Sequence, residues 1–84
     1  MIRGRKRPVT YDRAMENTVE IIVNGTPRRV REGSTLAGLI EEMGLGKMAC
    51  AAEVNRELVR KVERGGRVMR EGDVVEVVTL VGGG

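Results

Sequence analysis

The stretch that decides the fold is residues 71–84, EGDVVEVVTLVGGG. Within it, residues 74–81 (VVEVVTLV) hold five valines and a leucine, and only Glu76 and Thr79 interrupt the apolar run. A near-continuous β-branched run is typical of a strand in the middle of a sheet. We therefore expect a central strand that leads directly into three glycines.

The pattern upstream predicts a hairpin. Residues 18–23 (TVEIIV) largely alternate apolar and polar side chains, as a half-buried strand does. Asn24-Gly25 follows, and both residues tolerate the positive φ that a type I′ turn requires. Residues 26–30 (TPRRV) form the expected return strand, which belongs at the edge of the sheet because Pro27 cannot donate to a ladder.

One short helix follows the hairpin. Ser34 or Thr35 offers an N-cap, and Gly44 sits where a left-handed residue ends a helix, which leaves about nine helical residues. The apolar face consists of Leu36, Leu39, Ile40 and Met43. A helix this short does not persist alone, so we expect it to dock on a sheet face built from Val19, Ile21, Val23, Val75 and Val77.

The second half of the chain supplies the rest of the sheet. Residues 48–54 predict a strand, Asn55-Arg56 a turn, and residues 58–60 a short strand. Residues 61–69 are polar, with Val62 and Val68 as the expected anchors. The element order predicts an α+β fold of two layers, in which one main helix covers one face of a mixed sheet of four to five strands.

Composition excludes several classes of function. The 84 residues contain no histidine and one cysteine, so neither a histidine-based triad nor a Cys/His zinc site nor an internal disulfide can form. No apolar stretch approaches the roughly 18–20 residues that span a membrane. We expect a soluble cytoplasmic protein, monomeric when free, with no metal site and no stably bound cofactor.

The positive net charge lies in an N-terminal arm. Residues 1–17 hold five Arg/Lys and two Asp/Glu, and residues 18–84 hold ten of each, which gives +3 and 0. The arm is expected to be disordered because it has little apolar surface to bury. It could be an arm that binds nucleic acid, an inert extension or the product of a misassigned start at Met1 instead of Met15; binding to RNA or DNA is the least expected of these.

Cys50 is the only thiol, and the carboxylates are scattered, so we do not expect an enzyme. A nucleophilic or sulfur-carrying cysteine needs a lowered pKa from nearby cations or a helix N-terminus. Cys50 instead lies between Ala49 and Ala51 in a predicted strand, where a small apolar residue fills space.

The three glycines are an unusual ending for a central strand. Glycine contributes no packing, but an extended run without Cβ atoms can enter a narrow channel and present its terminal carboxylate. A carboxylate can attack the α-phosphate of ATP, and the acyl adenylate that results is open to a sulfur, oxygen or nitrogen nucleophile. The alternative is a floppy end or a cloning remnant without function.

Four motifs occur in an order that resembles the ThiS-type sulfur carrier proteins of bacterial thiamin synthesis. They are Val23-Asn24-Gly25, Glu32-Gly33-Ser34-Thr35-Leu36, Glu53-Val54-Asn55-x-Glu57-Leu58-Val59, and residues 71–84. The resemblance covers residues 18–84, and its ending is the most specific part. It implies the β-grasp, ubiquitin-like fold, with a domain at residues 18–81 and a flexible tail at residues 82–84. The arm at residues 1–17 is not part of the family pattern.

The resemblance also implies a mechanism. A ubiquitin-activating-like adenylyltransferase consumes ATP to adenylate Gly84, a persulfide donor converts the adenylate to a thiocarboxylate, and thiazole synthase accepts the sulfur. By position, Gly82 and Gly83 are the slender part of the tail that enters the partner's channel.

The sequence departs from the family pattern at Arg56, where glycine is common, so we expect that turn to differ. Three rival functions share the expected fold. These are the small subunit of molybdopterin synthase, a protein modifier that forms isopeptide bonds, and a β-grasp module that binds RNA through the basic arm.

Overall fold

The computed structural model describes residues 17–80. Most of the predicted arm (residues 1–16), Val81 and the glycine tail lie outside the described residues. Asn17, the last residue of the predicted arm, lies in a turn, and its carbonyl accepts a hydrogen bond of 2.8 Å from the amide of Glu32.

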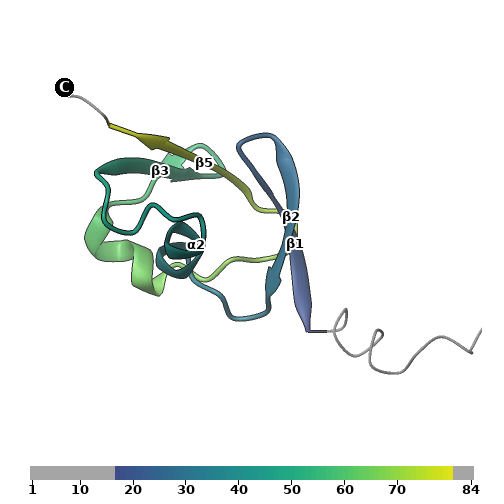
Figure 1. The fold of residues 1–84 in the computed structure, drawn as a ribbon. Helices are drawn as coiled ribbons and strands as arrows, with labels where there is room; N and C mark the ends of the chain where they lie inside the picture. Colours follow the sequence, from purple (N-terminus) through teal and green to yellow (C-terminus); the bar gives the residue numbers. More distant parts are fainter. Residues whose placement is uncertain (1–16, 81–84) are drawn as a thin grey trace, which may run out of the picture.

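A five-stranded mixed sheet forms one layer of the fold (Figure 1). Its strands are β1 (Thr18–Val23), β2 (Thr26–Arg31), β3 (Cys50–Val54), β4 (Glu57–Leu58) and β5 (Val74–Thr79). The spatial order is β2-β1-β5-β3-β4, so β5 is central and β2 is an edge, as predicted. β5 runs parallel to β1 and antiparallel to β3.

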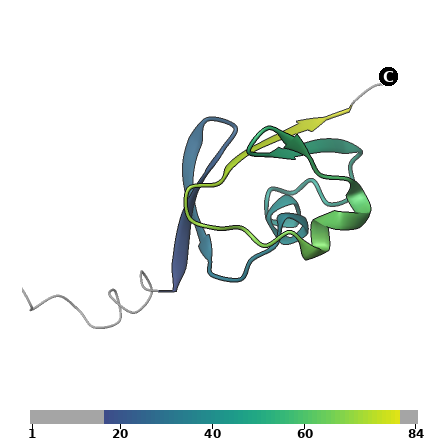
Figure 2. The same cartoon turned by 180° about the vertical axis from the view of Figure 1, so that it is seen from behind.

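The second layer is α2 (Leu36–Glu42), together with a 3-10 helix, η2 (Lys61–Gly66). Figures 1 and 2 show both on the same side of β3 and β5. Thr35 is the N-cap, and its hydroxyl accepts the amide of Gly38 at 3.1 Å. Gly44 has φ 81°, which ends the helix as predicted, although α2 has seven residues instead of nine.

The core lies between α2 and the sheet. Leu36, Leu39 and Ile40 are buried from the helix side, and Met43 packs against the core at its edge. From the sheet, Ile21, Val23, Val75 and Val77 are buried, with Val19 partly so. The prediction that Val75 and Val77 face the helix is therefore confirmed, and Val74 and Val78 point to the other face.

Between β4 and β5, the predictions of structure and of burial are partly wrong. Val62 is 80% exposed and is not an anchor, because it lies on the outer side of η2, an element that the sequence did not predict. Val68 is half-buried, and Met69, at 2% exposure, fills the core instead. The backbone of residues 67–69 runs beside the start of α2, with bonds from Leu36 to Arg67 and from Met69 to Ser34.

Boundaries of four strands also differ from the predictions, and β2 ends at Arg31 and not at residue 30. β3 begins at Cys50 and not at residue 48, and β4 covers Glu57–Leu58 and not residues 58–60. β5 ends at Thr79, within the run predicted to reach residue 81. Met48 and Ala49 lie in the turn before β3, and Val59 leaves β4 to enter the core at 8% exposure.

The two hairpin turns share one backbone form. Asn24 and Gly25 have φ 50° and 84°, as a type I′ turn requires. Asn55 and Arg56 have φ 54° and 72°, so the turn expected to differ keeps positive φ at both positions. Arg56 thus occupies a conformation that favours glycine.

We predict that Arg56→Gly raises the free energy of unfolding by up to about 1 kcal/mol, because glycine relieves a left-handed backbone that costs other residues roughly 1–2 kcal/mol. Urea denaturation measures the change. Arg56→Ala is the matched control: it removes the same side chain but keeps the strain, so it should give no gain. Equal stabilisation by both variants would contradict the backbone explanation.

Candidate functional site

The residue predicted to carry the chemistry, Gly84, lies outside the described residues with Gly82 and Gly83. The described residues show the strand that leads to them. The amide of Leu80 donates to the carbonyl of Ala49, the residue before β3, at 2.8 Å, so the backbone remains paired up to four residues before Gly84. Four extended residues reach at most about 14 Å.

Asn24 holds β5 from the side of β1. Its backbone amide donates to the Val75 carbonyl at 2.8 Å, which is an ordinary rung of the ladder. Its side chain then supplies one more rung: Oδ1 accepts the Val77 amide at 2.8 Å, and Nδ2 donates to the Val77 carbonyl at 3.2 Å. The hairpin residue therefore extends the parallel pairing beyond the end of β1.

Asn55 performs the same task from the side of β3. Its backbone amide donates to the Val74 carbonyl at 2.7 Å, and its Oδ1 accepts the Val74 amide at 3.0 Å. Its Nδ2 donates to Asp73 Oδ1 at 3.0 Å. Both asparagines were predicted only as turn formers. No local sequence signal reveals that their side chains form hydrogen bonds with β5, which lies far along the chain.

Asp73 is the buried charged residue of the described chain, at 6% exposure. Burial by itself opposes its ionisation, but the Arg70 amide, Asn55 and Arg67 together outweigh that effect, so the pKa of Asp73 is lowered. The Arg70 amide donates to Oδ2 at 2.8 Å, and Arg67 Nη1 lies 3.4 Å from the same oxygen. This network fixes the turn that starts β5.

The outer face of the sheet, opposite α2, is partly apolar. Ile22, Val74 and Val78 point outward from β1 and β5 and are 37%, 41% and 56% exposed. Glu53 and Glu76 lie directly opposite each other on β3 and β5, on this same face. Exposed apolar side chains gathered on one face are typical of a surface that binds another protein.

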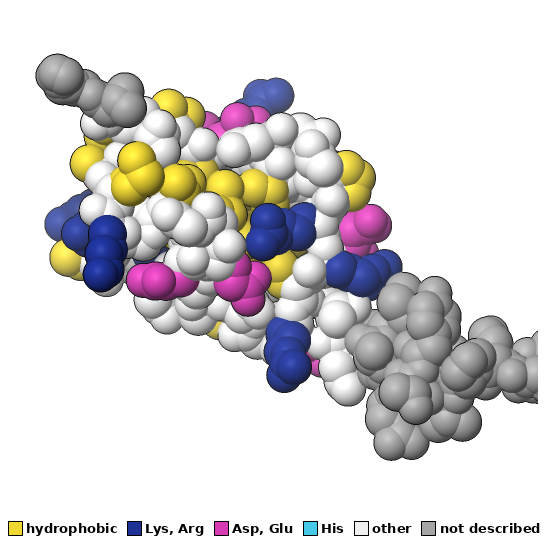
Figure 3. Space-filling model, in the orientation of Figure 1, with side chains coloured by type: hydrophobic (Ala, Val, Ile, Leu, Met, Phe, Trp, Pro, Cys, Tyr) yellow, Lys and Arg dark blue, Asp and Glu magenta, His cyan; other side chains and the backbone are white. Residues whose placement is uncertain are grey.

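A second apolar surface appears where the two layers meet. Figure 3 shows hydrophobic side chains in a band between the strands and α2, with charged side chains around it. Met48 and Leu80, 47% and 57% exposed, lie beside Ile40 and Leu45 around a small cleft there.

Cys50 packs against the core and lies beside Arg64. It is half-buried at the start of β3 and packs against the core. Arg64 from η2 approaches it, with Nη2 bonded to the Cys50 carbonyl at 2.9 Å and Nη1 3.6 Å from Sγ. Because Arg64 also donates to the Val59 carbonyl, it ties η2 to the end of the sheet. The packing of Cys50 against the core agrees with the space-filling interpretation, whereas the Arg64 guanidinium beside Sγ is a nearby cation that the sequence did not predict.

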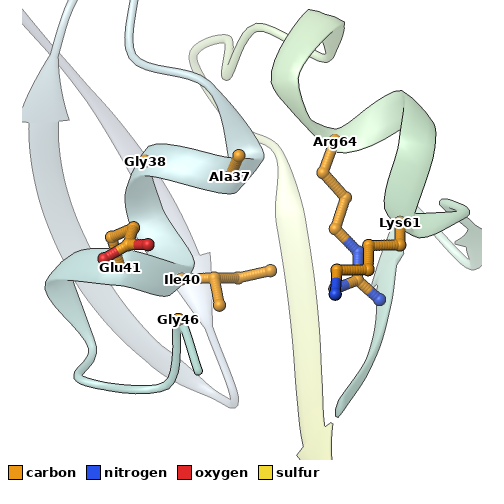
Figure 4. Close-up of a pocket in the computed structure, with 7 residues that line it drawn as sticks. All are labelled: Ala37, Gly38, Ile40, Glu41, Gly46, Lys61 and Arg64. Carbon is orange, nitrogen blue, oxygen red and sulfur yellow. The ribbon is translucent and has the colours of Figure 1, made fainter. Parts of the chain in front are cut away.

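The cleft between α2 and η2 does not assemble a reactive group. Figure 4 shows Ile40 pointing from α2 into this space, which Lys61 and Arg64 border from η2. Glu41 is its one carboxylate, and no histidine or hydroxyl accompanies it. Within residues 17–80, no group of His, Cys, Asp or Glu could hold a metal ion. In the same range, no helix is both long and apolar enough to cross a membrane.

Comparison with known proteins agrees with this architecture. The model of the ThiS family matches residues 21–84. Sulfur carrier protein ThiS of Thermus thermophilus is 45% identical over 62 residues, which cover 74% of this chain and 95% of that protein. A thiamine biosynthesis protein ThiS from Geobacter metallireducens, of known structure, superimposes with a TM-score of 0.67 at 25% identity, over 79% of this chain and all of its own.

A longer relative contains the same region. Thiazole synthase of Magnetococcus marinus is 36% identical over 66 residues, which are 79% of this chain but 20% of the relative. The fold is thus a β-grasp domain of the ubiquitin-like class. The chain belongs to the ThiS family.

We predict that Asp73 makes stability sensitive to acid. Because its pKa is lowered in the folded state, its stabilising effect is present above the unfolded pKa of about 4 and is lost as pH falls through the folded pKa. Asp73→Asn should cost about 1–3 kcal/mol at pH 7 and flatten the loss of stability below pH 4. Denaturation at several pH values measures this, and parallel pH profiles for the two chains would contradict it.

Proposed function

We propose that this chain is the sulfur carrier of thiamin synthesis and that its terminal carboxylate, on Gly84, carries the sulfur. The observation that carries the proposal is the central strand β5, which is paired up to Leu80 and followed within the family match by Val81 and three glycines. A rigid strand followed by side-chain-free residues suits delivery of a terminal group into a partner's channel.

The proposed chemistry has three steps. A carboxylate oxygen of Gly84 attacks the α-phosphate of ATP on an adenylyltransferase, and pyrophosphate leaves. The terminal sulfur of a persulfide then attacks the acyl carbon, and AMP leaves. In the third step a thiol attacks the donor's sulfur in this acyl disulfide, which releases the thiocarboxylate and leaves the donor in a mixed disulfide. A second thiol then restores the donor thiol, and the two reducing thiols leave as one disulfide.

Thiazole synthase is the proposed acceptor of the sulfur. A region similar to this chain occupies a fifth of a thiazole synthase chain, so a region of this kind is joined covalently to the rest of that relative. The adenylyltransferase and the persulfide donor are proposed from the chemistry.

Cys50 is not required by this chemistry. Its thiol lies beside Arg64 and against the core, and the proposed acyl transfer takes place on partner enzymes. If the Cys50 thiol carried the sulfur, the reaction would take place on the body of the domain. A variant without this cysteine therefore distinguishes a sulfur carried on Cys50 from one carried on Gly84.

We predict that one alanine added after Gly84, or Gly83→Val, lowers sulfur transfer by about 100-fold or more, because a displacement of about 1 Å can already cost that much. The chain is incubated with ATP, an adenylyltransferase of this family's pathway and a persulfide donor, and the C-terminal peptide is weighed. One oxygen of the native peptide should be replaced by sulfur.

Cys50→Ala is the control and should be modified like the native chain. Sulfur on Cys50, or full modification of the extended chain, would contradict the proposal. Attachment of the native chain to lysines of other proteins would instead indicate a protein modifier.

A further inference from the structure

The turn between β1 and β2 contains a chemically reactive pair of residues. The chain has three asparagines, which are followed by Thr18, Gly25 and Arg56. The side-chain amide of an asparagine is open to attack by the backbone nitrogen of the next residue. Glycine favours this attack because it has no Cβ and few backbone restrictions. Asn24-Gly25 is therefore the pair in this chain most prone to lose its side-chain amide, a reaction called deamidation.

The pair is accessible to water, which the reaction consumes. Asn24 and Gly25 are both exposed, and they form the tip of the hairpin. Within residues 17–80, no atom other than those of Gly25 and its two neighbours lies within 4 Å of the position that a Cβ on Gly25 would take. The described part of the chain thus leaves open space at this turn.

Strand β5 holds the reactive side chain in place. Oδ1 of Asn24 accepts the Val77 amide at 2.8 Å, and Nδ2 donates to the Val77 carbonyl at 3.2 Å. Two bonds to one residue fix both the position and the plane of the side-chain amide. Attack by the Gly25 nitrogen closes a flat five-membered ring, which needs nearly eclipsed torsions that a staggered side chain does not have. The side chain must therefore leave Val77 before it reacts.

We propose that Asn24 is a deamidation site, that its two bonds to Val77 protect it in the folded chain, and that its modification weakens the junction between β1 and β5. The inference goes beyond the proposed function and does not depend on it. The ligand of this site is water, and no partner protein is needed.

The reaction has two steps. The backbone nitrogen of Gly25 loses its proton and forms a bond to Cγ of Asn24, while the bond from Cγ to Nδ2 breaks and ammonia leaves. Water then opens the resulting succinimide ring. Opening at Cγ gives aspartate, and opening at the backbone carbonyl carbon gives isoaspartate, in which the chain runs through Cβ and Cγ. One water is consumed and one ammonia released, with no oxidation or reduction.

Both products lose the donor that Asn24 offers to Val77. In aspartate, a carboxylate oxygen replaces Nδ2, and an ionised carboxylate only accepts hydrogen bonds. Two acceptors then face each other where the native chain has a bond of 3.2 Å. In isoaspartate, the additional backbone carbon lengthens the turn. Either change weakens the pairing of the strand that leads to Gly84.

The test compares the folded chain with a synthetic peptide of residues 20–29 at mildly alkaline pH. Mass spectrometry of the fragment that contains Asn24 measures replacement of its NH₂ group by OH. The full chain should react at least about tenfold more slowly than the peptide, because only the fraction in which the side chain has left β5 reacts. In denaturant the two rates should become equal.

Asn55 provides a control within the same sample. It lies in a turn of the same backbone form, and its Oδ1 accepts the Val74 amide at 3.0 Å. Because Arg56 follows it, Asn55 should remain unmodified in denaturant over the time in which Asn24 reacts. Gly25→Ala is the matched variant: it keeps Asn24, and its Cβ has open space. It should slow the reaction of Asn24 even in the denatured chain.

The variant Asn24→Asp measures the effect of the aspartate product. Its thermal midpoint should fall by about 4–8 °C, since a bond to β5 is lost and an acceptor is left opposite the Val77 carbonyl. Exchange of the Val77 amide with solvent should be faster than in the native chain.

Four results would overturn the inference. They are reaction of Asn24 in the folded chain as fast as in the peptide or faster, no reaction in the peptide, equal reaction of Asn55, and an Asn24→Asp variant with unchanged midpoint and Val77 exchange. None of these measurements involves sulfur transfer, so failure of this inference and failure of the proposed function appear in different assays.

Discussion

The pairing of β5 on both of its edges is the constraint on which the rest of this structure depends. β5 lies between the β1–β2 hairpin and the β3–β4 hairpin, and it pairs with both of them to make one sheet. The hairpin asparagines strengthen both junctions, with Asn24 bonded to Val77 and Asn55 to Val74. With this strand in place, its inner valines complete the surface on which the seven-residue α2 docks. Without that surface, so short a helix would not persist.

In the same arrangement, charged side chains hold elements of the fold together. One helical layer covers one face of the sheet, and its core is apolar throughout. The buried charge, Asp73, is used to hold the turn that begins β5, and Arg64 is used to tie η2 to β3. What remains available is the outer face and the strand that continues toward Gly84. We propose that the strand leads to the group that carries the sulfur.

Much of this fold could be predicted from local sequence patterns. The valine run of β5, the Asn-Gly turn and the spacing of Leu36, Leu39 and Ile40 each depend on neighbouring residues alone, and each was predicted correctly. Val62 was wrongly predicted to be an anchor, and the burial of Met69 was not predicted, because Met69 is placed by the way residues 67–69 run beside α2, a contact between distant parts of the chain. The pairing of Glu53 with Glu76 could not be predicted either, because it depends on the register of β3 and β5. The predicted site itself, Gly84, rests on the motif and the family.

Native-state hydrogen exchange of the Val77 amide tests the central role of β5 most directly. This amide donates to a side chain, Asn24 Oδ1, and not to a backbone carbonyl. If β5 holds the fold together, the Val77 amide of the native chain exchanges only through global unfolding, as slowly as the most protected amides of the domain. In Asn24→Ala it should exchange by local opening. Rapid exchange of Val77 in the native chain, while β1 and β3 stay protected, would contradict the account.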